Sequence, residues 1–234
     1  MNPLIRLQRR EQLDNPALSG TRLHKTLGSL QLINTLFGNH AYLGDAVLRY
    51  CLSQSPQKSF HIVDLGCGGG DCIHTISSKL KKNGIQARFT GIDGNPESIV
   101  YAEKNNKRIE TVNYIVDDIL NPEFEIPDCD LIISSHFIYH FENQNLIRFL
   151  CKLDANKVKH AIFSDLYRSK AAYNLFKIFG YLLPLSSIAR QDGLVAIQRA
   201  FTIEEFENIL QNSKIKTFKI HKKSWFRTIT HINV

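Results

Sequence analysis

The chain has 234 residues, 43% of them hydrophobic and 22% charged, with a formal net charge of +7. This length fits one α/β domain with additions, and the composition can bury a sizeable core. Five cysteines occur without paired metal-site spacing, and their odd number fits a reducing cytoplasm. The first ten residues lack a signal-peptide core, and the most apolar stretch, residues 171–185, is too short to span a bilayer. We therefore expect a cytoplasmic protein with no metal site and no membrane span.

The excess of positive charge raises the question of nucleic-acid binding. The lysines and arginines are spread along the chain, mostly at predicted helix ends and outer faces, where a solvated surface explains them. No nucleic-acid-binding motif accompanies them. We expect weak, salt-sensitive contact with nucleic acid and no specific partner of that kind.

Residues 1–50 are expected to form a helical cover in front of the main domain, which we assign to residues 51–234. Apolar side chains recur at helical spacing in this part of the chain, at Leu23, Leu27, Leu30, Ile33 and Phe37. Residues 38–40 end this predicted helix, and a second helix runs over residues 42–51. The two helices can pack on the core, cover a ligand site, or do both.

Residues 60–71 form the most informative segment. A short apolar run is typical of a buried parallel strand, and four of the five residues 66–70 are glycine, where the backbone must turn sharply. A dinucleotide-binding loop would need a third glycine where Asp71 stands, and the lysine of a phosphate-binding loop is absent. With Asp64 before the turn and Asp71 after it, the turn suits a ligand of positive character without a phosphate.

The spacing Asp64-x-Gly66-x-Gly68-x-Gly70 resembles the glycine loop of class I S-adenosylmethionine (SAM) dependent methyltransferases. The ordered runs that follow extend the resemblance over residues 40–234 and favour the small-molecule, UbiE-like type of methyltransferase domain. The resemblance implies a Rossmann-like, doubly wound α/β fold. Its sheet has seven strands and is mostly parallel, with the last two strands antiparallel.

The next two apolar runs end in acidic residues. Asp93 lies about 20 residues past the glycine turn, the offset at which an acid meets the ribose hydroxyls of a nucleotide. Gly94 departs from the resemblance, which has an apolar residue there beneath the adenine. The third run ends in two acids, and the resemblance implies that Asp118 accepts from the adenine amino group while Ile119 packs on the ring. Asp117 is the close alternative to Asp118.

The fourth run, residues 130–141, ends in His140 and Phe141. It resembles the fourth strand and following loop of methyltransferases that act on small molecules. Enzymes that methylate exocyclic base nitrogens carry two consecutive prolines at this place, which this chain lacks. Residues 159–166 supply a fifth strand, and helices are expected near residues 71–83, 96–107 and 143–152.

A helical insertion is expected after the fifth strand, at residues 167–200. It is rich in bulky apolar and aromatic side chains, and in this fold it would lie over the carboxyl ends of strands four and five as a substrate lid. An apolar helix ending at Pro184 can equally be part of the core. The capping box from Thr202 to Glu205 starts the last core helix, and residues 216–220 and 228–234 read as the final strands.

The resemblance implies a complete set of site residues. SAM as cofactor would be bound by Asp64, Gly66, Cys67, Gly68, Asp93, Gly94, Asp117, Asp118, Ile119 and Ser134. His136 is the candidate general base because it lies nearest the strand end, and His140 is either a second catalytic candidate or a structural residue. The substrate would contact Phe137, Tyr139, Tyr173, Phe176 and Phe179.

We therefore expect transfer of a methyl group from SAM to a small, apolar or aromatic hydroxylated metabolite. A carbon nucleophile is possible in place of the hydroxyl. The alternatives are a non-catalytic SAM-binding module and an rRNA or tRNA methyltransferase. The oligomeric state does not follow from the sequence.

Overall fold

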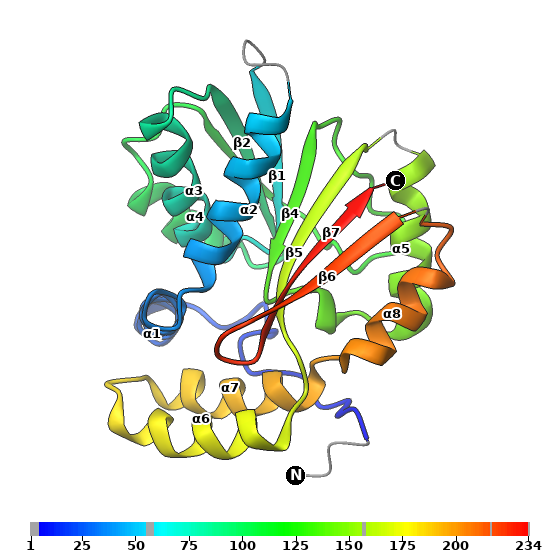
Figure 1. Cartoon of the computed structure of the whole chain (residues 1–234). Helices are drawn as coiled ribbons and strands as arrows, with labels where there is room; N and C mark the ends of the chain where they lie inside the picture. Colours follow the sequence, from blue (N-terminus) through cyan, green and yellow to red (C-terminus); the bar gives the residue numbers. More distant parts are fainter. Residues whose placement is uncertain (1–4, 55–58, 156–157, 216, 234) are drawn as a thin grey trace.

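The computed structural model describes residues 5–54, 59–155, 158–215 and 217–233. Its centre is a seven-stranded sheet in the order β3-β2-β1-β4-β5-β7-β6 (Figure 1). The strands are β1 (Phe60–Leu65), β2 (Ala87–Asp93), β3 (Val112–Val116), β4 (Leu131–Ser135), β5 (His160–Leu166), β6 (Thr217–Lys223) and β7 (Arg227–Asn233). Strands β1 to β5 are parallel, and β7 runs antiparallel to both β5 and β6. The expected fold class is confirmed, although Lys216 and Val234 of the predicted last strands lie outside the described residues.

Two helical layers cover the sheet. One face packs against α2 (Asn39–Ser53), α3 (Asp71–Lys82) and α4 (Pro96–Asn105), and the other against α5 (Asn143–Ala155) and α8 (Ile203–Gln211). Local signals explain the helix starts. The Asn95 side chain accepts from the backbone N–H groups of Glu97 and Ser98 with Pro96 at the first helical position, and the Thr202–Glu205 capping box forms as expected.

Three further helices lie at the carboxyl edge of the parallel strands. They are α1 (Gly20–Leu36), α6 (Lys170–Leu182) and α7 (Ser187–Arg199), the last two forming an antiparallel pair below the sheet in Figure 1. Ser186, between α6 and α7, donates its N–H to the Ser29 hydroxyl at 2.9 Å, which ties the pair to α1. The insertion after β5 is therefore helical, as expected, and it lies against the N-terminal helix.

The predicted second N-terminal helix begins earlier than expected. Only Phe37 and Gly38 separate α1 from α2; Gly38 has a φ of +68°, and α2 starts at Asn39 rather than at residue 42. Buried residues of α2 join those of α3 in one apolar cluster, so this helix covers the sheet rather than the ligand edge alone. The division of the chain into a cover and a main domain at residue 51 stays a prediction. Among the described residues, no helix combines the length and apolar character needed to cross a membrane.

Candidate functional site

A cavity of about 870 Å³ lies at the carboxyl edge of the sheet. Its lining comes from the glycine loop, the loops after β2, β3 and β4, helices α1, α6 and α7, the β6–β7 turn and the N-terminal segment, residues 8–16. Ligands of doubly wound sheets bind at this edge, where the strand order reverses between β1 and β4. The cavity is large enough for a nucleoside-sized cofactor and a small second ligand.

The glycine loop is held rigidly at the mouth of β1. The N–H groups of Gly66 and Cys67 both donate to the Ile92 carbonyl, at 2.9 and 3.0 Å. Gly66 has a φ of +71°, and a Cβ there would meet the Phe137 ring at 2.4 Å. No larger residue fits this position, because the turn and the ring occupy the space of a side chain.

Two buried acids flank this loop with different partners. The Asp93 carboxylate accepts from the N–H groups of Gly68 and Asn95, both at 2.9 Å, and lines the cavity. Asp64 is 1% exposed, and neither of its carboxylate oxygens has a hydrogen-bond partner within the described chain. Burial, together with the charges of Asp71 and Asp93, raises the pKa of Asp64 well above its usual range. A cationic ligand beside Asp64 would relieve both its missing hydrogen bonds and the repulsion between the carboxylates.

The remaining predicted cofactor residues divide into two groups. Cys67, Gly94, Asp118 and Ile119 line the cavity. Asp117 is absent from the lining, so the geometry favours Asp118 of the two acids. Ser134 is fully buried beneath the cavity and the next residue, Ser135, lines it, because successive side chains of a strand point to opposite faces.

His136 follows β4 in a backbone conformation rarely adopted by non-glycine residues, with a φ of +57°. Its Nε2 atom contacts the guanidinium of Arg227, which can only donate, so Nε2 must accept. Burial, with the positive charge of Arg227, holds the pKa of His136 well below its usual range. The hypothesis that His136 is a base titrating near neutrality does not agree with this environment, because the accepting nitrogen is already engaged.

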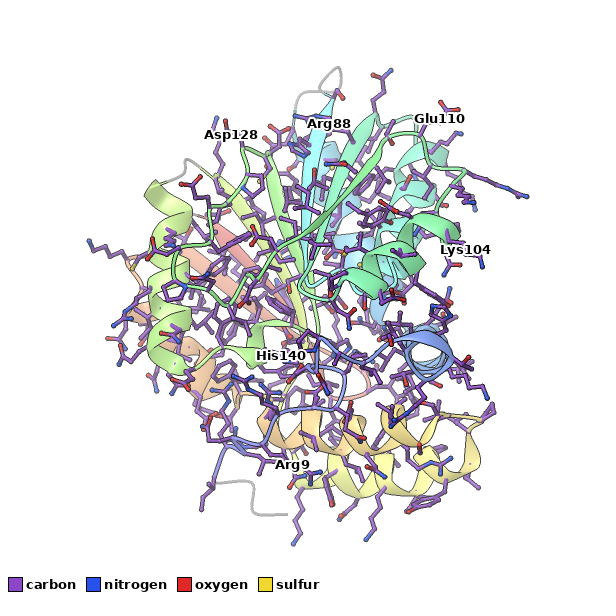
Figure 2. The ribbon with its side chains drawn as sticks, turned by 180° about the vertical axis from the view of Figure 1, so that it is seen from behind. Arg9, Arg88, Lys104, Glu110, Asp128 and His140 are labelled. Atoms are coloured by element: carbon purple, nitrogen blue, oxygen red, sulfur yellow. The ribbon has the colours of Figure 1, made fainter. Side chains whose placement is uncertain are left out.

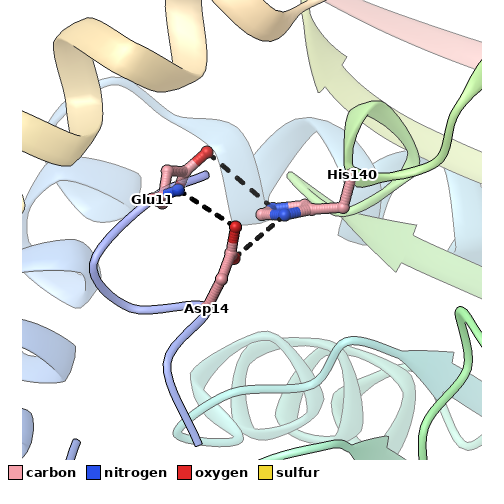
Figure 3. A group of neighbouring side chains, drawn as sticks. All are labelled: Glu11, Asp14 and His140. Carbon is pink, nitrogen blue, oxygen red and sulfur yellow. Dashed lines mark hydrogen bonds and ion pairs between the residues drawn. The ribbon is translucent and has the colours of Figure 1, made fainter. Parts of the chain in front are cut away.

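His140 lies in the same loop and is held between two carboxylates of the N-terminal segment (Figure 3). Its Nδ1 atom is 3.0 Å from Asp14 Oδ1, and its Nε2 atom is 3.9 Å from Glu11 Oε1. A single metal ion can bind only one nitrogen of an imidazole, whereas these carboxylates face different nitrogens. The arrangement therefore suits hydrogen bonding and proton transfer at the ring better than metal ligation.

The two acids of this cluster, which we call the His140 cluster (Glu11, Asp14, His140), carry opposite pKa shifts. Burial raises the pKa of Glu11 to about 7. Burial also acts to raise the pKa of Asp14, but hydrogen bonds and charges from His140 and Arg199 outweigh it and lower the pKa to about 2. Asp14 is thus a carboxylate at any physiological pH, and it keeps a proton on Nδ1 of His140.

The N-terminal segment is held in place by α7. Asp192 of α7 is 4% exposed and accepts from the N–H groups of Gln12 and Leu13, both at 2.9 Å. Arg199 of α7 donates to Asp14 at 2.7 Å. In the view from behind, the N-terminal segment runs past His140 near the middle of the molecule, and Arg88, Glu110 and Asp128 lie toward the top (Figure 2).

Aromatic and aliphatic side chains form the wall away from the glycine loop. Helix α6 contributes Ala172, Leu175, Phe176 and Phe179, whose spacing puts them on one face, and Phe137 and Tyr139 also line the cavity. The expected contact Tyr173 falls off this face and is not part of the lining. Trp225 of the β6–β7 turn packs at a tilted angle against Phe37, the residue that follows α1, with ring centroids 5.0 Å apart.

Several site residues were not predicted from the sequence. Glu11 and Asp14 stand in a segment without regular structure, where no periodicity marks them. Asp192 and Arg199 could have been found from the sequence. They are seven residues apart and therefore on the same face of a helix, and the other residues of that face are apolar. Arg227, directly before the strand expected at residues 228–234, had no distinguishing pattern.

Comparisons with known proteins agree with this geometry. Residues 62–155 match the model of a family described as methyltransferase domain, and no curated protein matches the sequence significantly. The plantazolicin methyltransferase BpumL, solved with a pentazolic desmethylPZN analog and SAH (S-adenosylhomocysteine), is similar with a TM-score of 0.65 and 19% identity over 90% of both chains. Magnesium protoporphyrin IX methyltransferase (ChlM) from Synechocystis PCC 6803, with bound SAH, is similar with a TM-score of 0.54 and 14% identity over 84% of both chains.

Larger proteins also contain this fold. The CurJ carbon methyltransferase is similar with a TM-score of 0.62 and 14% identity, over 83% of this chain and 53% of that one. The citrinin polyketide synthase CMeT domain is similar with a TM-score of 0.58 and 10% identity, over 77% of this chain and 48% of that one. The chain thus spans about half the length of these two proteins.

Proposed function

We propose that this chain is a class I SAM-dependent methyltransferase and that it methylates a hydroxyl group of a small apolar or aromatic metabolite, with His140 as the general base. The observation that carries the proposal is the His140 cluster. It has an imidazole oriented by a permanent carboxylate, in the wall of the cavity that also contains the glycine loop and Asp93.

The residues around the glycine loop fit the cofactor. Asp64, with two unpartnered oxygens, suits the ammonium of the methionine part, and Asp93, beside the N–H of Gly68, suits the ribose hydroxyls. Asp118 and Ile119 suit the adenine, and the neighbouring lining residues Leu13 and Pro16 offer the apolar cover that Gly94 does not provide. When bound, SAM supplies an electrophilic methyl carbon on a sulfonium.

His140 would remove the proton that a hydroxyl nucleophile must lose. Asp14 keeps Nδ1 protonated, so the lone pair is on Nε2, the nitrogen required for a base. The imidazolium formed there is stabilised by Asp14 on one side and by ionised Glu11 on the other. The remaining task of the protein is to orient the nucleophile and exclude water, which the N-terminal segment and the α6–α7 pair do by covering the cavity.

The walls of the cavity support an apolar substrate. Phe176 and Phe179 of α6, Phe37 after α1 and Trp225 of the β6–β7 turn offer aromatic surface on three sides. Such a lining binds flat or aliphatic groups through burial of apolar area. A nucleic-acid substrate is disfavoured, because the cavity is covered by two segments and lined by at least five acidic side chains: Glu11, Asp14, Asp64, Asp71 and Asp93.

An acidic C–H group is the second candidate nucleophile. It also needs a base before it attacks, so the His140 cluster serves both reactions. A non-catalytic SAM-binding module would have no use for a base oriented in this way, although the cofactor residues alone would suit it.

A turnover panel tests the proposal. Hydroxylated aromatic acids and phenols, aliphatic hydroxy compounds, 1,3-dicarbonyl compounds and short structured RNAs would each be incubated with the enzyme and SAM, and SAH release would be measured. We expect turnover with a hydroxyl compound, and His140→Ala should lower it about a hundredfold with SAM binding intact. His221→Ala, an exposed histidine on β6, is the matched control. Tight SAM binding without turnover on any substrate would indicate a binding module instead.

A further inference from the structure

Arg227, the first residue of β7, is a buried cation that forms no ion pair with any residue the structure describes. Its side chain is 2% exposed and lines the cavity. No carboxylate of the described residues lies within ion-pair distance of it, and its Nε atom has no hydrogen-bond partner. Burial lowers the pKa of Arg227 only to about 10, so the guanidinium stays charged at neutral pH.

Two other basic side chains near Arg227, in contrast, each lie beside a carboxylate. His40 lies 3.4 Å from Asp71, and His140 lies 3.0 Å from Asp14. Asp165 attracts Arg227 through its charge but lies beyond ion-pair distance, and it lines a second small pocket to which Tyr139 and Leu166 also contribute. Arg227 is cross-strand to Leu166 and therefore on the cavity side. A buried charge left without compensation is destabilising, so its retention at a cavity wall points to a ligand that compensates it.

His136 gives this guanidinium a fixed direction. Its Nε2 atom accepts from Nη1 of Arg227, and its own backbone N–H is fixed to the Ser164 carbonyl at 2.9 Å. The histidine is neutral, since the neighbouring bases and burial hold its pKa low, so it accepts without repelling the arginine. The remaining guanidinium donors form a planar fork that matches a carboxylate.

We propose that Arg227, positioned by His136, is a carboxylate-binding subsite of the cavity. A carboxylate is favoured over a phosphate, because the same cavity contains several acidic side chains that would repel a dianion. The carboxylate can come from the methionine part of SAM or from the methyl acceptor, and in the second case the inference rests on the proposed function. Both sources share one chemistry, and the experiment separates them.

Calorimetry on the purified full chain tests the subsite with two pairs of probes. The first pair is SAM and decarboxylated SAM, which differ only in the carboxylate. The second is a set of aromatic and aliphatic hydroxy acids, each beside its primary amide, titrated into protein saturated with SAH. The variants are Arg227→Met and Arg227→Lys, and Arg88→Met is the control, since Arg88 is an exposed arginine of β2 at the opposite end of the sheet (Figure 2).

We expect the wild type to prefer the carboxylate member of one pair by about ten- to a hundredfold, and Arg227→Met to abolish that preference without weakening the uncharged member. Arg227→Lys should restore part of it, and Arg88→Met should change nothing. His136→Leu should reduce the preference, and His136→Gln, which keeps an acceptor, should recover it. Because no ion pair is lost, the melting temperature of ligand-free Arg227→Met should equal or exceed that of the wild type.

Two results would overturn the subsite. One is a wild type that binds both members of every pair equally. The other is an Arg227→Met variant that loses affinity for decarboxylated SAM or the amides as much as for the acids, which would indicate a structural role. Failure of the proposed function looks different: no compound of the turnover panel is methylated, while the preference for SAM over decarboxylated SAM persists.

Discussion

Replacing Asp14 by asparagine isolates the contribution of the carboxylate that orients the base. The folded environment lowers the pKa of Asp14 from 3.8 to about 2, in spite of burial, and a difference of this size corresponds to about 2.5 kcal/mol. His140 and Arg199 share this stabilisation. If they share it equally, Asp14→Asn should lower kcat about tenfold, and if His140 has all of it, about sixtyfold.

The assay is the initial rate of SAH release at saturating substrate, with SAM affinity measured separately by calorimetry. We expect kcat to fall and SAM affinity to stay, because Asp14 faces His140 and Arg199 rather than the glycine loop. Asp128→Asn, at an exposed position at the opposite end of the sheet (Figure 2), controls for loss of one charge. A folded Asp14→Asn enzyme with wild-type kcat would refute the role of Asp14, and with it the argument that His140 needs an orienting partner.

Three further outcomes are expected. Asp93→Ala should weaken SAM binding by about 2 kcal/mol or more in calorimetry, since charge-assisted hydrogen bonds are lost; unchanged affinity would remove Asp93 from the ribose site. The unfolding free energy of Glu11→Gln should rise relative to that of the wild type by up to about 3 kcal/mol as pH increases from 4.5 to above 7. The reason is that a carboxyl whose pKa is raised on folding to about 7 destabilises the fold once it is ionised. Parallel curves of unfolding free energy against pH would contradict this. Phe176→Ala and Phe179→Ala should raise KM for the methyl acceptor more than Kd for SAM; equal effects on both would move the substrate wall elsewhere.

The sequence was sufficient for the sheet and for placing acidic residues at its carboxyl edge. Parallel strands buried on both faces appear as short apolar runs, and their carboxyl ends meet at one edge, so each acid after a run could be assigned to that edge. Asp64, Asp93 and Asp118 lie there for this reason. The choice between Asp118 and Asp117 could not be made from the run, because a strand end uncertain by one residue reverses which side chain faces the ligand.

The partners of His140 could not be predicted, since they depend on contacts between segments far apart in the chain. Glu11 and Asp14 reach His140 only because Asp192, about 180 residues later, accepts from the backbone of Gln12 and Leu13. No local pattern encodes such a contact. The sequence argument preferred His136 because it stands nearer the strand end, but proximity along the chain says nothing of Arg227, which approaches from β7 and occupies the ring nitrogen.

Three of the four non-glycine residues with a positive φ in the described chain also line the cavity; the fourth, Lys214, follows α8 and does not line it. His136, Trp225 and Phe226 have φ values of 57°, 62° and 57°, in the left-handed region that costs a non-glycine residue about 1–2 kcal/mol. All three line the cavity and lie beside Arg227 in the chain or in contact with it. Asparagine or glycine would relieve the strain in a turn that had only to join two strands. Bulky aromatic residues at such positions are explained if the turn has to present Trp225 and Phe226 to a ligand, with the unpaired guanidinium next to them. The side of the cavity around the glycine loop is thus built from regular strand ends, and the side around Arg227 from strained and long-range contacts, which is where the specificity for a second ligand should be sought.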